Sequence, residues 1–351
     1  MAKIDVLFNE LIARKGSDLH LEQDKRPKFR INGDLLETAE HPVLTQGYLC
    51  EILKEISPAM VWQRFEDTGD VDFAYALANG ARFRANYLRH FFGYGAVFRH
   101  IPSKILKFEE LGVPEICKSL CDLQSGLVLV TGPTGSGKSS TLAAMIDYIN
   151  SKFVKKIITI EEPIEFFHKN NKSIIIHREV GVDTESFAQG LRSALKSDVN
   201  IILVGEMRDR ETIELALTAA EMGIFVLATL HTNSAAKTID RIIDSFPGAK
   251  KEQIREILAN TLQAVLAQQL IKSIDGSRRW ASFEILLRTT ALPAIIRAGD
   301  TIALKEEVST NAQEGMISMD NYLLQLVKDG KITRAAAYLK MLDKSLISNT
   351  S

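Results

Sequence analysis

The apolar positions of this chain change their spacing close to residue 100. In the first hundred residues, apolar and polar positions mostly alternate in short runs, and this period of two is typical of strands. The predicted strands lie at 71–76, 81–88 and 95–101. A hairpin is also predicted over 18–36, around an Asn32-Gly33 turn. Helical spacing is found at 4–11, 45–57 and 58–66. Together these elements predict a small α+β domain at 1–101.

Beyond residue 118, short apolar runs alternate with helical patterns. This alternation predicts a parallel α/β sheet, because buried parallel strands are apolar on both faces. The predicted strands lie at 128–130, 157–160, 199–204 and 224–230. A long helix is predicted at 250–271, followed by a strand at 280–286 and helices at 291–297, 319–328 and 332–342. Because 102–118 shows little periodicity, we predict a linker there and a second domain at 119–351.

The apolar run at 126–131 leads into a glycine-rich loop and then into a helix. The loop has the spacing G-x-x-x-x-G-K-S, which in this strand–helix context predicts a phosphate-binding P-loop. Its backbone N–H groups would face phosphate oxygens, Lys138 would reach the β- and γ-phosphates, and Ser139 would hold Mg²⁺. The predicted nucleotide-binding residues of the loop are Gly132, Pro133, Thr134, Gly135, Ser136, Gly137, Lys138, Ser139 and Ser140.

Three more strands of the predicted sheet end in chemically useful residues, which are Glu161, Glu206 and His231. Ligands of parallel α/β sheets bind at the carboxyl ends of the strands, so these residues and the P-loop are expected at one edge. Phosphoryl transfer to water needs a carboxylate that orients the water, and Glu161 and Glu206 are both candidates. His231 could hydrogen-bond the γ-phosphate.

The strand predicted at 81–88 places Arg82, Arg84 and Asn86 on one face, and Arg99 lies at the end of the next strand. Two interpretations stay open for these arginines. They are either surface residues on an exposed sheet face, which is the commoner case, or residues that reach the nucleotide.

The net charge is −1, from 43 basic and 44 acidic residues, so we predict no nucleic-acid partner. Acidic residues within the N-terminal apolar run argue against a secretory signal, and no apolar segment approaches the roughly 20 residues of a membrane span. We therefore expect a cytoplasmic protein. The three cysteines, Cys50, Cys117 and Cys121, form no C-x-x-C pair and are predicted to be core thiols.

With these motifs in place, the sequence resembles the type IV pilus retraction ATPases, the PilT family of secretion-type ATPases. The similar stretches run nearly end to end, and the last three are far more specific than a P-loop. They are Gly16–His20, Arg82–Arg84, Gly132–Ser139, Thr159–Phe166, Arg178–Gly181 with Asp183–Phe187, Leu203–Asp209 and Ala228–Asp240.

The resemblance implies a small PAS-like α+β domain followed by a RecA-like P-loop ATPase domain with a helical C-terminal part. The catalytic residues that it implies are Lys138, Glu161 in an acidic box, Glu206 in the Walker B box and His231 in a histidine box. The residues that it implies around Mg²⁺ are Ser139, Glu162 and Glu206. Arginines matching Arg84 and Arg99 approach ATP between the two domains in this family.

The same resemblance implies a homohexameric ring that turns ATP hydrolysis into work on a platform protein of the inner membrane, at the base of the pilus. The ring would lie peripherally at the inner face of that membrane, and a paralogous pilus ATPase is a further implied partner. Extension ATPases of the superfamily carry an additional N-terminal region and usually a four-cysteine metal site. The chain shows neither, which favours retraction.

The chain departs from the family pattern at three places. Glu162 stands where the family usually has aspartate, Ile224 replaces a usual histidine, and 196–200 lacks a common proline. These changes suggest a paralogue with altered kinetics or partners. Two alternatives therefore stay open: an accessory or weakly hydrolysing paralogue that assists another retraction ATPase, and a RecA-like nucleic-acid translocase, although no basic strip or aromatic stacking platform is evident in the sequence.

Overall fold

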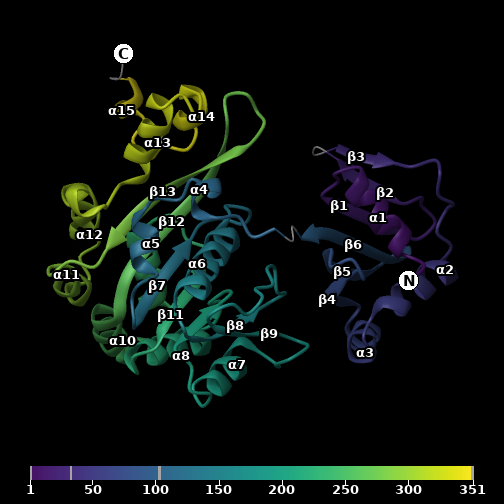
Figure 1. Cartoon of the computed structure of the whole chain (residues 1–351), viewed down its shortest axis with the longest axis horizontal. Coiled ribbons are helices and arrows are strands. Elements are labelled where there is room, and N and C mark those ends of the chain that lie inside the picture. The colour runs from purple at the N-terminus through teal and green to yellow at the C-terminus, as the bar shows by residue number, and fades with distance from the viewer. Residues whose placement is uncertain (1, 32–33, 102–103, 349–351) are drawn as a thin grey trace. The chain divides into compact units, whose positions relative to one another are not determined.

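The structure is a computed structural model that describes residues 2–31, 34–101 and 104–348. The chain divides into two compact units (Figure 1). The N-terminal unit comprises Met1–Lys104 together with Glu162–Phe167, and the C-terminal unit comprises Ile105–Glu161 and His168–Ser351. The turn predicted at Asn32-Gly33 lies outside the described residues.

The described part of the N-terminal unit contains a six-stranded antiparallel sheet in the order β3-β2-β1-β6-β5-β4. Its elements are α1 (Asp5–Ala13), β1 (Asp18–Glu22), β2 (Lys28–Ile31), β3 (Asp34–Glu37), α2 (Gln46–Ile56), α3 (Ala59–Thr68), β4 (Asp70–Ala76), β5 (Arg82–His90) and β6 (Gly93–Ile101). The three helices bury apolar faces in a core that they share with the sheet.

Aromatic rings fill the centre of this core. The ring of Phe8 stacks on Phe83 with 4.2 Å between centroids, and it meets Phe98 edge-on at 4.9 Å. Along β5, Phe83 and its alternate neighbours are buried, whereas Arg82 and Arg84 on the other face are half-buried. The predicted alternation of this strand is therefore confirmed, because a period of two sends successive side chains to opposite faces.

The segment Glu162–Phe167 follows a strand of the C-terminal unit in sequence but belongs to the N-terminal unit. Arg82 makes two of its contacts there. Its Nη1 donates a hydrogen bond to the carbonyl oxygen of Ile164 at 2.7 Å, and its guanidinium carbon lies 4.0 Å from the centroid of the Phe167 ring. A planar guanidinium over an aromatic face is a favourable cation–π arrangement, so Arg82 fastens this segment to β5.

The described part of the C-terminal unit contains a seven-stranded sheet in the order β13-β12-β7-β11-β10-β8-β9, in which only β13 runs antiparallel to its neighbour (Figure 1). Its strands are β7 (Gly126–Thr131), β8 (Lys156–Glu161), β9 (Ile174–Glu179), β10 (Ile201–Val204), β11 (Phe225–Leu230), β12 (Leu262–Lys272) and β13 (Arg279–Leu287). Its helices are α4 (Phe108–Leu111), α5 (Ile116–Leu120), α6 (Lys138–Lys152), α7 (Phe187–Ala194), α8 (Arg210–Glu221), α9 (Ala235–Asp244), α10 (Gly248–Thr261), α11 (Leu292–Ala298), α12 (Thr301–Thr310), η1 (Ala312–Glu314), α13 (Met319–Lys328), α14 (Arg334–Tyr338) and α15 (Ser345–Ser348).

The strand order decides which face each helix covers. The connection from β7 through α6 to β8 runs one way across the sheet, whereas the connections through α7 and α8 return the opposite way. Because such crossovers are right-handed in nearly all proteins, α6 lies on one face and α7 and α8 lie on the other. In agreement, α6 packs on β7, while α8 contacts α7, α10, β7 and β11.

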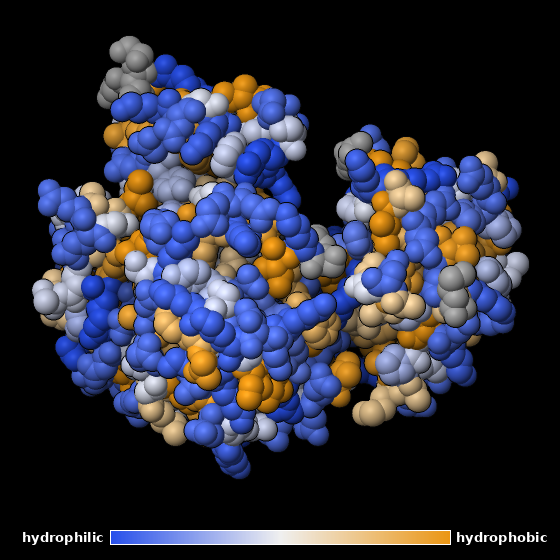
Figure 2. Space-filling view, in the orientation of Figure 1, coloured by the Kyte–Doolittle hydropathy of each residue, from blue (hydrophilic) through white to orange (hydrophobic). Residues whose placement is uncertain are grey.

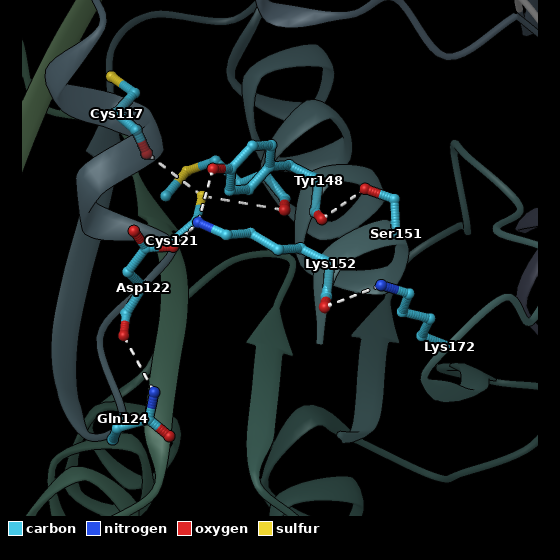
Figure 3. Close-up of polar contacts among 9 residues, drawn as sticks. Cys117, Cys121, Asp122, Gln124, Tyr148, Ser151, Lys152 and Lys172 are labelled. Carbon is cyan, nitrogen blue, oxygen red and sulfur yellow. Dashed lines mark hydrogen bonds and ion pairs between the residues drawn. The ribbon is translucent and has the colours of Figure 1, made fainter. Parts of the chain in front are cut away.

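The stretch 102–118, which the sequence predicts as a linker, contains α4 and begins α5, and both helices pack against α6. Beyond α5, the chain is tied to the far end of α6 (Figure 3). Lys152 Nζ donates to Asp122 Oδ1 at 2.8 Å and to the Tyr148 hydroxyl at 3.0 Å. These contacts fix the end of α6 that lies away from the P-loop.

The two cysteines of this region are part of the hydrophobic core of the C-terminal unit. Cys117 and Cys121 are 0% and 2% exposed, and the Cys121 thiol donates to the carbonyl oxygen of Cys117 at 3.2 Å (Figure 3). Burial raises the pKa of the Cys117 thiol to about 12 and raises that of Cys121 as well. The prediction of core thiols is confirmed for these two residues, whereas Cys50 is only half-buried.

The predicted helix at 250–271 is wrong in its second half. The helix α10 ends at Thr261, and residues 262–272 form β12, which pairs with β7 on one side and β13 on the other. The run from Leu262 to Ala267 is almost entirely buried, so its apolar residues do not mark one helical face. A continuous apolar run fits a buried helix and a buried strand equally well, and here the sheet supplies the hydrogen-bond partners.

Hydrophilic residues predominate on the face of the molecule drawn in Figure 2, and hydrophobic residues occur there in small scattered groups. Within residues 2–31, 34–101 and 104–348, no helix combines the length and the apolar composition that crossing a membrane requires.

Candidate active site

The carboxyl ends of four neighbouring strands meet at one edge of the C-terminal sheet. Thr131, the last residue of β7, pairs with Leu230 at the end of β11, and Val204 of β10 lies between Ala228 and Ile160. The residues that follow these strands are therefore brought to the same edge, as the sequence predicts. They are the P-loop, Glu161, Glu206 and His231.

The P-loop leaves β7 through a backbone that only glycine adopts without strain. Gly132, Gly135 and Gly137 have φ values of 145°, 77° and 90°. At Gly132 a Cβ atom would lie 2.2 Å from the carbonyl oxygen of Gln268, so no other residue fits there. The ammonium of Lys138 donates to the carbonyl oxygens of Gly132 at 2.9 Å and Pro133 at 3.1 Å.

The loop residues differ in their exposure. Ser136 and Lys138 are 3% and 9% exposed. Pro133, Thr134 and Gly135 are exposed, whereas Gly137, Ser139 and Ser140 are half-buried. Among the described residues, the buried hydroxyls of Ser136 and Thr131 have no hydrogen-bond partner. Buried hydroxyl donors beside a glycine backbone and an ammonium suit an anion with several acceptor oxygens, so the loop fits the predicted phosphate.

Gln268 on β12 lies next to the P-loop and hydrogen-bonds the helix that follows it. Its Oε1 accepts a hydrogen bond from the Thr141 hydroxyl at 2.8 Å, and both side chains are buried. Because Thr141 lies in the first turn of α6, this bond joins the start of the P-loop helix to β12. The sequence prediction missed Gln268, since it placed residue 268 in a helix.

Glu206 is held from two sides. Its Oε1 lies 3.0 Å from His231 Nε2, and its Oε2 accepts a hydrogen bond from Arg208 Nε at 2.7 Å. A carboxylate can only accept, so the proton of the His231 ring must lie on Nε2. The structure thus brings Glu206 and His231 into direct contact, as expected for neighbouring strand ends, and adds Arg208, to which the sequence assigned no role.

The backbone around Glu206 is anchored between neighbouring strands. Gly205 N–H donates to the Ile160 carbonyl at 2.8 Å, and Met207 N–H donates to the Thr229 carbonyl at 3.0 Å. Three residues beyond Glu206, Asp209 caps α8 by accepting from Thr212 N–H at 2.9 Å. A carboxylate on so constrained a segment has little freedom to leave the edge of the sheet.

The loop after His231 is fixed by a half-buried carboxylate. Ser234 caps α9, and the next N–H, that of Ala235, donates to Glu284 Oε1 at 2.7 Å. Burial raises the pKa of Glu284 above its ordinary value, with backbone hydrogen bonds acting in the opposite direction. Glu284 is a second supporting residue that the sequence prediction missed, because its only signal is a lone acid in a largely apolar strand.

The acidic box is divided between the two units. Glu161 is the last residue of β8 and half-buried, while Glu162 is exposed and belongs to the N-terminal unit. In the part of the chain that the structure describes, no three His, Cys, Asp or Glu side chains gather in a way that could hold a metal ion. The roles predicted for Glu161 and Glu162 stay predictions.

Arg84 and Arg99 are cross-strand neighbours in the N-terminal sheet. Arg84 Nε lies 3.3 Å from Asp72 Oδ1, and Arg99 Nε lies 2.8 Å from Asp18 Oδ1. The Asp18 side chain is only 7% exposed, and its hydrogen bonds with Ser17 and Arg99 outweigh the effect of burial and lower its pKa. Both arginines thus have acidic partners within their own unit, and their predicted approach to the nucleotide stays a prediction.

Two histidines lie where the chain returns to the C-terminal unit after the segment Glu162–Phe167. His177 on β9 contacts the Thr159 hydroxyl through Nδ1 at 2.9 Å, and its Nε2 accepts from the His168 N–H at 3.1 Å. The two rings stack with 5.8 Å between centroids. Burial, with a smaller contribution from the neighbouring His177, lowers the pKa of His168 from its ordinary value of 6.5 to about 4.

Comparison with known proteins agrees with this geometry. A model of the family described as Type II/IV secretion system protein matches residues 1–315. The chain belongs to this family. It is 47% identical over 326 residues to the type IV pilus retractation ATPase PilT of Pseudomonas aeruginosa, and the match covers 93% of this chain and 94% of that protein. It is 45% identical over 311 residues to a twitching motility protein of Neisseria gonorrhoeae, with 89% and 83% covered.

A solved structure of the family has the same fold. The crystal structure described as the pilus retraction motor PilT with bound ADP matches with a TM-score of 0.90 at 39% identity, and the match covers 100% of both chains. These likenesses confirm the predicted kinship with the pilus retraction ATPases, the predicted fold class and the prediction that the chain is an ATPase. As an ATPase, the chain binds a nucleotide.

His168 should make the C-terminal unit sensitive to acid. Between the unfolded pKa near 6.5 and the folded pKa near 4, the unfolded chain binds a proton that the folded chain does not. The free energy of unfolding should therefore fall as the pH is lowered through this window, by up to about 3 kcal/mol. Urea unfolding of the wild type and of His168→Leu between pH 7.5 and 4.5 measures this, and the variant should show the shallower slope. Equal slopes would contradict the assignment.

Lys138→Ala should abolish ATP hydrolysis and most ATP affinity. The variant loses a charge-assisted contact to the phosphates in a partly dry site, where such contacts are strong. Binding of a fluorescent ATP analogue and steady-state phosphate release give the two readouts. Lys152→Ala, at the exposed far end of the same helix, is the matched control and should behave as the wild type. Normal turnover by Lys138→Ala would remove the P-loop from the mechanism.

Proposed function

We propose that this chain is the subunit of a hexameric ring motor that hydrolyses ATP to retract type IV pili, the movement that underlies twitching motility. The observation that carries the proposal is the extent of the likeness to PilT, which spans nearly the whole length of both proteins and so includes the N-terminal unit. The ring would lie at the inner face of the cytoplasmic membrane and act on a platform protein at the base of the pilus.

The P-loop would hold the triphosphate. Its N–H groups and the start of α6 would face the phosphates, and Lys138 would exchange the loop carbonyls for phosphate oxygens. The half-buried Ser139 hydroxyl suits a place in the shell of Mg²⁺, with Glu206 and Glu162 as outer members of that shell. Bound with the phosphates, Mg²⁺ would neutralise part of their charge.

Glu206 would orient the attacking water. Its anchored backbone supports this role, because a water-orienting carboxylate must keep its place as charge develops on the phosphate. Glu161 ends the adjacent strand β8 and would add a second carboxylate to the site. His231 contacts Glu206. When the γ-phosphate is lost, a movement of His231 would be transmitted to α9 through the anchored loop that joins them. In the ring, Arg84 and Arg99 would contribute positive charge to the nucleotide.

An accessory role beside another retraction ATPase is the second candidate. The observation that favours it is the pair of departures at Glu162 and Ile224, which suggests altered kinetics or partners. Such a protein would bind ATP, assemble and hydrolyse slowly.

Glu206→Gln should bind ATP normally while its turnover falls by about 10²-fold or more, because the neutral amide cannot accept a proton from the attacking water. The measurement is turnover at saturating ATP beside equilibrium binding of the nucleotide. Glu221→Gln, an exposed glutamate at the end of α8, is the control and should leave turnover unchanged. Should Glu161→Gln be the far more damaging change and Glu206→Gln be nearly silent, the two roles are reversed.

Deleting the protein should leave pili assembled but unable to withdraw. Surface pilus counts and twitching in the deletion strain test this, with complementation by the wild type and by Glu206→Gln. Many surface pili and lost twitching, restored only by the wild type, are expected of the motor. Normal twitching would favour the accessory role, and a strain without pili would make the protein an extension ATPase.

A further inference from the structure

Large apolar residues are exposed near the end of the C-terminal unit. The helices α13, α14 and α15 gather at one end of this unit (Figure 1), where α13 packs on β13 and α14 packs on β12. In and beyond α14, Leu339 and Leu342 are 77% and 72% exposed, and Tyr338 and Leu346 are exposed as well. We call these four residues the C-terminal patch. Single exposed apolar residues are ordinary, but a group of them marks an interaction site.

An open groove of about 350 Å³ lies within this patch, between α14 and α15. It is lined by Arg334, Ala335, Tyr338, Leu339 and Ile347. Apart from the Arg334 guanidinium and the Tyr338 hydroxyl, the side chains of this lining are apolar. The groove therefore suits an apolar group that has an anion close to it.

The segment that carries the patch is fixed to the unit by hydrogen bonds. Asp320 on α13 accepts from the N–H groups of Leu342 and Asp343, at 2.9 Å and 2.8 Å. Farther along, Arg334 Nη2 donates to the carbonyl oxygen of Ile347 at 2.6 Å, and the Ile347 side chain is buried. Because the backbone of the segment is held at both places, the exposed leucines cannot turn inward without breaking these contacts.

Basic residues accompany the patch. From residue 334 to residue 347 the chain has three cations, Arg334, Lys340 and Lys344, and one acid, Asp343. Lys340 and Lys344 are exposed, and Lys344 Nζ lies 4.9 Å from the centroid of the Tyr338 ring. One carboxylate can neutralise only one of the three cations. The segment is therefore locally positive, and charge complementarity favours an anionic partner.

The position of Leu342 decides between a peptide and a lipid surface. Leu342 does not line the groove, so a peptide that filled the groove would leave this residue exposed. A lipid surface covers Leu339 and Leu342 together, because it needs no matching cavity. Exposed apolar side chains beside lysines and arginines are also typical of segments that lie in a membrane interface, where the cations meet headgroup phosphates.

We propose that the C-terminal patch binds the surface of a membrane that contains anionic phospholipids. Leu339 and Leu342 would enter the boundary between headgroups and acyl chains, while Lys340 and Lys344 would contact phosphates. One patch of this size binds weakly and reversibly. The inference goes beyond the proposed function, since this lipid contact would serve a retraction motor and an accessory protein alike.

The test is cosedimentation of the full-length protein with vesicles of phosphatidylcholine, with or without phosphatidylglycerol. Vesicles with phosphatidylglycerol should bind about ten-fold or more tightly, and added salt should weaken this binding. Joint Leu339→Ser and Leu342→Ser substitution should weaken it about ten-fold, because two apolar side chains are lost. Joint Lys340→Glu and Lys344→Glu substitution should reduce it to the level of phosphatidylcholine alone.

Two controls separate loss of the patch from loss of the fold. ATP turnover and the melting temperature without vesicles should be unchanged in both double variants, because the substituted side chains are exposed. Phe91→Ser removes an apolar residue that is 95% exposed in the turn between β5 and β6, and it should bind vesicles as the wild type does.

Three results would overturn the inference. The first is a wild type that does not bind vesicles with phosphatidylglycerol, and the second is a pair of double variants that bind as well as the wild type. The third is a lipid-free wild type that forms larger assemblies than the Leu339→Ser, Leu342→Ser variant by light scattering, because a second copy would then cover the patch. A protein that binds vesicles but hydrolyses no ATP would refute the proposed function and support this inference.

Discussion

The position of β7 between β11 and β12 is the constraint on which the candidate site depends. All six residues of this strand are buried, and both of its edges are occupied by parallel neighbours. The parallel register aligns the carboxyl ends of β7, β11 and β10 at one edge of the sheet. The P-loop, Glu206 and His231 therefore owe their proximity to backbone hydrogen bonds rather than to contacts among themselves.

Within that frame, the charged groups of the site have partners from the same chain. The buried ammonium of Lys138 rests on two carbonyl oxygens, and Glu206 lies between His231 and Arg208. Burying an unpaired charge is costly, so these contacts let the site keep its charges without straining the fold. A substrate that enters such a site exchanges partners with these groups, and each exchange can be coupled to movement of the segment that supplied the original partner.

The features that were predicted correctly from the sequence are those marked by a local periodicity or by a motif. The alternation in β5, the apolar strand before the P-loop and the acids and histidine at strand ends all have local signatures, and the structure places them as expected. The wrong prediction concerns a sequence pattern that is compatible with two kinds of secondary structure. The buried run at 262–272 fits a helix or a strand, and its assignment to β12 depends on partners distant in sequence. The supporting roles of Gln268 and Glu284 escaped prediction for the same reason, since their partners Thr141 and Ala235 are distant in sequence. Arg208 contacts the nearby Glu206, but no sequence pattern marks that contact.

The segment Glu162–Phe167 gives the chain an interleaved domain organisation. Its two flanking residues, Glu161 and His168, belong to the C-terminal unit, while the segment itself packs with the N-terminal unit through Arg82. No single cut in the polypeptide can therefore separate the two units cleanly. A fragment that begins near residue 105 would carry Phe167 and the buried Ile164 without the strand that contacts them, so the two units are expected to depend on each other as the chain folds.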